Sequence, residues 1–164
     1  MKNYDGGVIM AKAEKKQVPL EAGLWNACNK LRGSVTATDY VNVVLGLLFL
    51  RFAYDKFNAQ REKLLADEET ADFIDNPRFY SKDNVFFLEE NDRWNYIKDN
   101  SKSNKIFTYI DDAFRNMEKN NPTLKGALPI GFYITLHIEP SKFSSLIDEI
   151  DRIQYSQEES DDVI

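Results

Sequence analysis

Apolar side chains recur at intervals of three and four residues along most of the chain, and this spacing predicts helices. The first helix begins at Pro19, whose missing N–H suits an opening turn, and ends at Gly33. Its apolar stripe consists of Leu20, Leu24, Ala27, Cys28 and Leu31. We therefore expect a short helix over 19–33 that buries one face.

The second stretch predicts a long central helix. Thr36 or Thr38 can cap its start, because a threonine hydroxyl accepts a hydrogen bond from a first-turn N–H group. Apolar residues occupy one side at helical spacing and then fill the other side: Val41, Val44, Leu45, Leu48, Phe49 and Phe52, and Val43, Leu47, Leu50, Tyr54 and Phe57. A strand is rejected because the spacing continues from Asp55 to Leu65. Neighbouring elements should therefore enclose most of this helix.

The middle of the chain predicts less regular structure. Residues 67–81 alternate acidic and aromatic side chains, which favours a loop with room for one helical turn. Val85–Leu88 favours a short extended piece. Asn91 or Asp92 can cap a short helix that carries Trp94.

Two further helices are predicted after this region. Ser103 can cap the first, which stops at Asn121-Pro122, and Pro140 opens the second. Their apolar stripes are Ile106, Tyr109, Ile110, Ala113, Phe114 and Met117, and Phe143, Leu146, Ile147, Ile150 and Ile153. Between them, Leu124–Leu136 contains glycines and a proline and predicts a loop, although Phe132–Ile138 alternates well enough to leave a short strand open.

Together these elements predict a mostly α fold: a compact bundle of about five helices with long loops and at most one short β element. The strand and helix alternation that builds a parallel sheet is missing. We expect a folded domain over 19–155, a flexible lead-in over 1–18, and an acidic tail or linker over 156–164.

Composition limits which ligands and which cellular compartment suit the protein. The chain has 164 residues, with 27 acidic against 21 basic side chains and a net charge of −6, which disfavours a broad basic surface for DNA. Cys28 is the one cysteine, so an internal disulfide is excluded, and no secretory signal pattern is present. The most apolar run, Val43–Leu50, is far shorter than the roughly 20 residues that span a bilayer. We expect a cytoplasmic protein with no membrane contact.

Residues with catalytic chemistry are sparse. The seven glycines are scattered, so no phosphate or cofactor loop is predicted. Cys28 and His137 alone cannot build a zinc site or a hydrolytic triad, and we expect a structural or exposed histidine and a small buried thiol. The acidic pairs at 89–90 and 111–112 could hold a metal, but such pairs are more often solvated. No catalytic, cofactor-binding or metal-binding residue is predicted in this chain.

One short motif invites a functional interpretation. Asn76-Pro77-Arg78-Phe79 is similar to the Asn-Pro-Pro-aromatic motif with which amino-methyltransferases hold a flipped adenine, although Arg78 replaces the second proline. No preceding half for a methyl donor is present, so a capped turn is the favoured interpretation.

Several segments, in the same order, resemble the N-terminal domain of the modification subunit of type I restriction systems, which methylates adenine at N6. The resemblance spans about Leu20 to Ile153. The segments are Leu24–Ala27, Lys30–Gly33, Asp39-Tyr40, Val44–Phe52, Asn84–Phe86, Arg93-Trp94, Ile110–Phe114 and Asn121–Pro129. The chain departs from the family pattern at Phe87–Glu90 and at Ile130–Tyr133.

This resemblance implies a helical, non-catalytic domain that precedes an S-adenosylmethionine-dependent methyltransferase domain. It implies no cofactor in this chain, and S-adenosylmethionine in the parent enzyme. The implied partners are the catalytic domain, a specificity subunit that reads DNA, DNA itself within the assembly, and the restriction subunit as a further candidate. A helical module joined to the catalytic domain could clamp the duplex while a base is flipped.

Four basic residues are candidates for phosphate contacts. Lys102 and Lys105 form the stronger pair, because a helix N-terminus adds N–H donors and positive dipole. Lys30 and Arg32 form the second pair, although Arg32, like Arg51, is also expected to make an intramolecular salt bridge. Isolated surface lysines are usually only solvated.

An alternative function stays open. A stand-alone helical interaction or regulatory module, with no methyltransferase partner domain, would also suit a net charge of −6, either by mimicking DNA or by binding protein.

Overall fold

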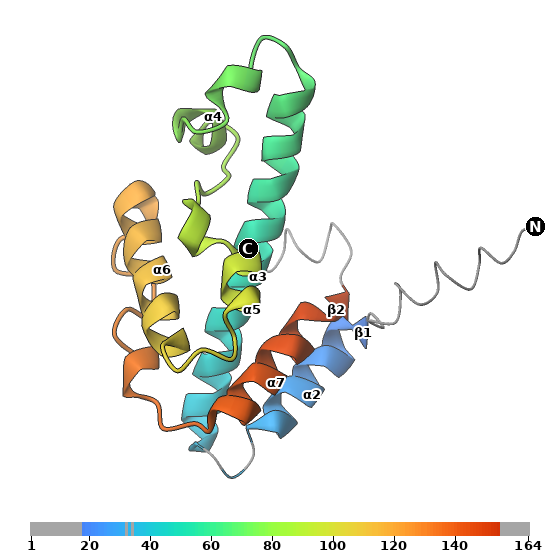
Figure 1. Cartoon of the computed structure of the whole chain (residues 1–164), viewed down its shortest axis with the longest axis vertical. Coiled ribbons are helices and arrows are strands. Elements are labelled where there is room, and N and C mark those ends of the chain that lie inside the picture. Colours follow the sequence, from blue (N-terminus) through green and yellow to red (C-terminus); the bar gives the residue numbers. More distant parts are fainter. Residues whose placement is uncertain (1–17, 32, 34, 155–164) are drawn as a thin grey trace, which may run out of the picture.

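The computed structural model describes residues 18–31, 33 and 35–154, and within them the fold is mostly helical, as predicted (Figure 1). The α-helices are α2 (Leu20–Lys30), α3 (Ala37–Ala66), α4 (Arg78–Ser81), α5 (Trp94–Asp99), α6 (Ile106–Asn120) and α7 (Pro140–Asp151). Short 3₁₀ turns are η1 (Ala71–Phe73), η2 (Glu90–Asp92), η3 (Pro122–Leu124) and η4 (Tyr133–Thr135). Two-residue strands β1 (Val18–Pro19) and β2 (Ile153–Gln154) pair in parallel. The predicted lead-in, the predicted tail and Arg32 lie outside the described residues, Val18 excepted.

The long helix α3 runs the length of the molecule, with α2 and α7 beside its lower half and α6 on the opposite side in Figure 1. Thr36 caps it as predicted, because its hydroxyl oxygen accepts a hydrogen bond from the N–H of Asp39 at 3.2 Å. Buried side chains point from several of its sides, including Val43, Leu47 and Phe52. The expected enclosure is confirmed for most of the positions from Val43 to Leu50, but it was wrong for Val41 and Leu45, which are 46% and 56% exposed. The second half of α3 extends toward α4 at the upper end of the molecule in Figure 1.

Helices α2 and α7 pack together, and the N-terminal end of α2 meets the C-terminal end of α7 at the β1–β2 pair. Gly23 of α2 permits this approach, because a Cβ there would overlap the side chain of Ile153. Pro19 serves as the N-cap residue of α2, one position before the first helical turn in which it was predicted.

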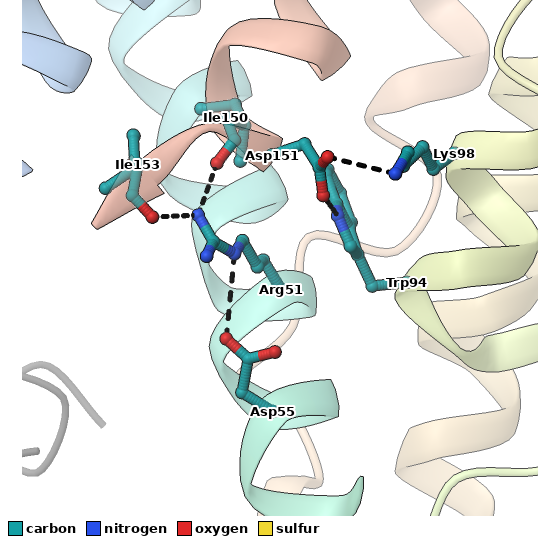
Figure 2. A network of polar contacts seen from close by, with 7 residues as sticks. All are labelled: Arg51, Asp55, Trp94, Lys98, Ile150, Asp151 and Ile153. Carbon is teal, nitrogen blue, oxygen red and sulfur yellow. Dashed lines mark hydrogen bonds and ion pairs between the residues drawn. The ribbon is translucent and has the colours of Figure 1, made fainter. Parts of the chain in front are cut away.

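Arg51 and Asp151 tie the end of α7 to the rest of the bundle (Figure 2). Arg51 of α3 donates hydrogen bonds to the carbonyl oxygens of Ile150 at 2.7 Å and Ile153, so it occupies the C-terminal end of α7 where carbonyls lack helical partners. Its Nε also pairs with Asp55 at 3.6 Å, which confirms the predicted salt bridge. Figure 2 shows Asp151 accepting from the indole of Trp94 at 2.9 Å and pairing with Lys98 of α5 at 3.1 Å.

Some local details differ from the sequence expectations. The loop predicted before Pro140 is confirmed, and the strand left open over 132–138 does not form: residues 133–135 make the 3₁₀ turn η4, with Tyr133 buried in the core, and the short β pair lies at 18–19 and 153–154. Neither Asn91 nor Asp92 caps α5; its N-cap is Arg93, and the two residues belong to η2. The short helix α4 is the one helical turn that the predicted loop over 67–81 left room for. No described helix is long and apolar enough to cross a membrane.

Candidate functional site

The predicted basic pair Lys102 and Lys105 lies in the turn between α5 and α6. Lys105 is the N-cap residue of α6, and its own N–H donates to the hydroxyl of Ser103 at 3.0 Å. Ser103 was predicted as the N-cap, but it instead orders the turn just before the helix. Both lysines are exposed, and both precede α6 in the chain, at the end of the helix where its dipole is positive.

The start of α7 lies against this turn. The hydroxyls of Ser101 and Ser144 are 3.1 Å apart, and the rings of Phe107 and Phe143 have centroids 4.6 Å apart. An open pocket of about 480 Å³ separates the turn from α7; its lining is Lys102, Pro140, Ser141, Ser144, Ser145 and Asp148. The N-terminal ends of α6 and α7 therefore meet around Lys102, and we call this meeting place the α6–α7 corner.

The other predicted pair is less well placed. Lys30 is the last residue of α2 and is exposed, but it lies at the negative end of its helix dipole. Arg32 lies outside the described residues.

In the acidic pair at 111–112, the first residue, Asp111, has a structural role. Asp111 is buried, accepts a hydrogen bond from the N–H of Gly131, and pairs with Nε of Arg115 at 2.8 Å. Asp112 and the pair at 89–90 are exposed. The expectation of solvated carboxylates was therefore wrong for Asp111. No group of three or more potential metal ligands occurs among the residues that the structure describes.

The Asn76–Phe79 motif forms the predicted capped turn. The side-chain oxygen of Asn76 accepts from the N–H of Arg78 at 3.0 Å, and Phe79 stacks on Phe73 with ring centroids 4.8 Å apart. His137 is exposed and Cys28 is half-buried, where burial raises the pKa of its thiol.

Sequence reasoning missed a polar pocket between η2, α5 and α6. Its volume is about 380 Å³, and its lining is Asn91, Asp92, Tyr96, Tyr109, Asp112, Arg115 and Asn116. Asp92 is only 1% exposed, and burial raises its pKa to about 6, against the lowering effect of a hydrogen bond from Asn116. Asp92 stood out in the sequence only as a possible helix cap, because the pocket depends on packing between distant elements.

Comparison with known proteins identifies the family. Residues 20–150 match the family model described as the HsdM N-terminal domain. The chain is also 28% identical, over 152 residues, to the type I restriction enzyme MjaIX methylase subunit of Methanocaldococcus jannaschii, and the aligned region covers 84% of this chain and 27% of that protein. The chain thus spans about a quarter of the length of this curated relative. Because the family model matches most of the helical structure from α2 to α7, this chain belongs to the HsdM N-terminal domain family.

Proposed function

We propose that this chain is the non-catalytic N-terminal domain of a type I restriction-modification methylase subunit, and that it helps to clamp DNA and to assemble with the specificity subunit. The family match over 20–150 supports the domain assignment. The parent enzyme would use S-adenosylmethionine to methylate adenine at N6 in the cytoplasm, with the restriction subunit as a further partner. Residues 19–155 would form the folded unit, with 1–18 as a lead-in and 156–164 as the linker toward the catalytic domain.

The α6–α7 corner is the observation that carries the DNA-clamping part of the proposal. Two helix N-termini and two exposed lysines, Lys102 and Lys105, converge there. N-terminal N–H groups and lysine ammonium groups are both suited to phosphate oxygens. Electrostatic effects at a surface are local, since charges are screened over about 10 Å at moderate salt. The net charge of −6 is therefore compatible with a locally positive surface at the α6–α7 corner.

Two features limit the strength of this contact. Asp148 lines the same pocket, and Glu139 precedes α7, so both oppose a phosphate near Lys102. Lys30 would add a weaker contact from the end of α2, as would Arg32. We therefore assign a few phosphate contacts to this domain within a larger interface shared by the assembled enzyme.

Charge reversal in the assembled enzyme tests this proposal. The double variant Lys102→Glu, Lys105→Glu should weaken binding of a duplex containing the target site by about tenfold or more at roughly 0.1 M salt. The affinity should also fall less steeply with salt concentration, by the amount expected for the loss of about two phosphate contacts. Fluorescence anisotropy measures both quantities. The matched control is Lys63→Glu, Lys119→Glu, which reverses two exposed lysines at the last turns of α3 and α6. Equal affinities for the two double variants would refute the DNA contact.

One observation favours the alternative, a protein-interaction module without a methyltransferase partner domain. An apolar groove of about 500 Å³ lies between α3 and the 124–132 segment; its lining includes Leu45, Phe49, Leu128 and Phe132. Leu45 is 56% exposed, and apolar surface of this kind suits a protein partner rather than DNA. If co-purification showed the chain in no complex with a methyltransferase or a specificity subunit, this alternative would replace the first proposal.

A further inference from the structure

The polar pocket between η2, α5 and α6, here the Asp92 pocket, contains a carboxylate that the fold leaves incompletely paired. Oδ1 of Asp92 accepts a hydrogen bond from the side-chain amide of Asn116 at 3.1 Å. Its Oδ2 is buried and has no hydrogen-bond partner among the described residues. A buried carboxylate oxygen without a donor is costly, so a site that keeps one is suited to a ligand that supplies the donor.

Arg93, which follows Asp92 in the chain, and Arg115, which lines the pocket, both interact with other groups. Nε of Arg93 donates to the carbonyl oxygen of Leu88 at 3.2 Å, and its guanidinium lies 4.7 Å from the centre of the Phe57 ring. Nε of Arg115 pairs with Asp111 at 2.8 Å, although Arg115 also lines the pocket. Neither arginine donates a hydrogen bond to Oδ2 of Asp92, so this buried oxygen has no donor among the described residues.

The remaining lining identifies the chemical class of the ligand. Asp112 of α6 also lines the pocket; it is exposed and adds a second negative charge. Tyr96 and Tyr109 contribute two rings whose centroids are 5.8 Å apart, inclined at 65°. Carboxylates and tyrosine faces both attract ammonium and guanidinium groups. The two carboxylates repel a phosphate, and about 380 Å³ is enough for the end of one long side chain or a small amine.

We propose that the Asp92 pocket binds an organic cation with N–H donors, either a lysine or arginine side chain of a protein partner or a free amine of the polyamine type. The ligand's N–H group pairs with the Asp92 carboxylate, and its charge lies between Asp112 and the two tyrosine rings. The pocket has its own lining, separate from Lys102 and Lys105. The inference therefore stands independently of the proposed DNA contact.

Amide chemical shifts of the full chain test this site at pH 7.5, where Asp92 is ionised. The probes are N-acetyl-lysine methylamide, N-acetyl-arginine methylamide and spermidine, compared with sodium chloride at the same ionic strength. Saturable shifts are expected at Tyr96, Tyr109 and the Asn116 side chain, with a dissociation constant on the order of 1–10 mM for the single-residue probes. If spermidine binds tightly and the two amino-acid amides do not, the natural ligand is a free amine. If the amides bind as tightly as spermidine, the natural ligand is a lysine or arginine side chain of a protein.

Two substitutions give the controls. Asp92→Asn keeps the shape and removes the charge, and should weaken binding by about tenfold. Asp112→Asn changes only an exposed wall residue and should weaken it by a smaller factor, so the proposal stays testable if the first variant folds poorly. Asp148→Asn, outside the pocket, should leave binding unchanged. The proposal is overturned if no cation produces saturable shifts at these residues, or if the Asp92→Asn and Asp112→Asn variants bind as tightly as the native chain.

Discussion

Tyr133 and Gly46 fit together as a pair in the core of the domain. The Tyr133 hydroxyl donates to the carbonyl oxygen of Val43 at 2.6 Å, and it occupies the space that a side chain at Gly46 would need. A Cβ at Gly46 would lie 3.1 Å from the Cζ atom of the ring and would overlap the hydroxyl oxygen. Gly46 therefore lets η4 dock directly onto the backbone of α3, and the fully buried ring closes the core between them.

Substitution of Gly46 by alanine should destabilise the domain. Alanine favours the helix by about 1 kcal/mol, but overpacking against an immobile buried ring and loss of its hydrogen bond cost more. We expect a net loss of about 1–3 kcal/mol in the free energy of unfolding, measured by urea denaturation. Tyr133→Phe supplies the control, because it removes the overlapping hydroxyl. The cost of Gly46→Ala should fall in the Tyr133→Phe background, and strictly additive costs would contradict the contact.

Leu48 and Leu45, in the same helix, should respond differently to the same substitution. Leu48 is 4% exposed and Leu45 is 56% exposed. Leu48→Ala should cost about 2–5 kcal/mol, because it leaves a cavity in the core, whereas Leu45→Ala should change stability by less than about 1 kcal/mol. Thermal melting of both variants measures the difference. Similar melting temperatures would show that the faces of α3 are wrongly assigned.

Arg51 should stabilise the end of α7 locally. Arg51→Met keeps much of the side-chain length but removes the donors to Ile150 and Ile153, at a cost of about 2 kcal/mol. Hydrogen exchange should accelerate most in the last turn of α7 and in the first turn of α2, which packs on it. Unchanged protection in these two turns would contradict the capping role.

Asp92 should make stability depend on pH in a defined direction. Its pKa of about 6 lies above the ordinary value of 3.8, so this group's contribution to stability is complete below about pH 4 and is lost as the pH rises through 6. The Asp92→Asn variant lacks this loss. Its stability relative to the native chain should therefore be greater at pH 8 than at pH 4 by about 3 kcal/mol. Urea denaturation at both pH values measures it, and a pH-independent difference would contradict the raised pKa.

Sequence spacing predicted the long elements well because their burial repeats with the helical period. The stripe of α6, from Ile106 to Met117, and the cap at Thr36 are both local features, and both were confirmed. The features that the sequence left open or assigned wrongly involve tertiary contacts. Residues 132–138 alternate like a strand, which left a strand open, but the Tyr133 hydroxyl is fixed by α3 far away in the sequence. Asp111 was expected to be solvated as part of an acidic pair, but it is buried and accepts a hydrogen bond from the N–H of Gly131.

The candidate sites were predictable to different degrees. Lys102 was recognisable because helix starts can be located from the sequence. That the start of α7 lies beside it could not be predicted, because this depends on the contact between Ser101, in the turn after α5, and Ser144 of α7. The Asp92 pocket could not be predicted, because its walls come from η2, α5 and α6. The segments quoted for the family resemblance also have structural roles: Asn121 accepts from the N–H of Phe87 at 2.9 Å and donates to its carbonyl at 3.0 Å.

The most direct test of the central claim is lysine reactivity in the assembled methylase, with and without a duplex that carries its target site. Acetylation of each lysine is quantified by mass spectrometry at low reagent concentration. A DNA-clamping domain predicts that Lys102 and Lys105 become protected when DNA binds, while Lys63 and Lys119, at the far ends of α3 and α6, keep their reactivity. Equal reactivity of all four lysines in the free and DNA-bound enzyme would contradict the claim that the α6–α7 corner faces DNA.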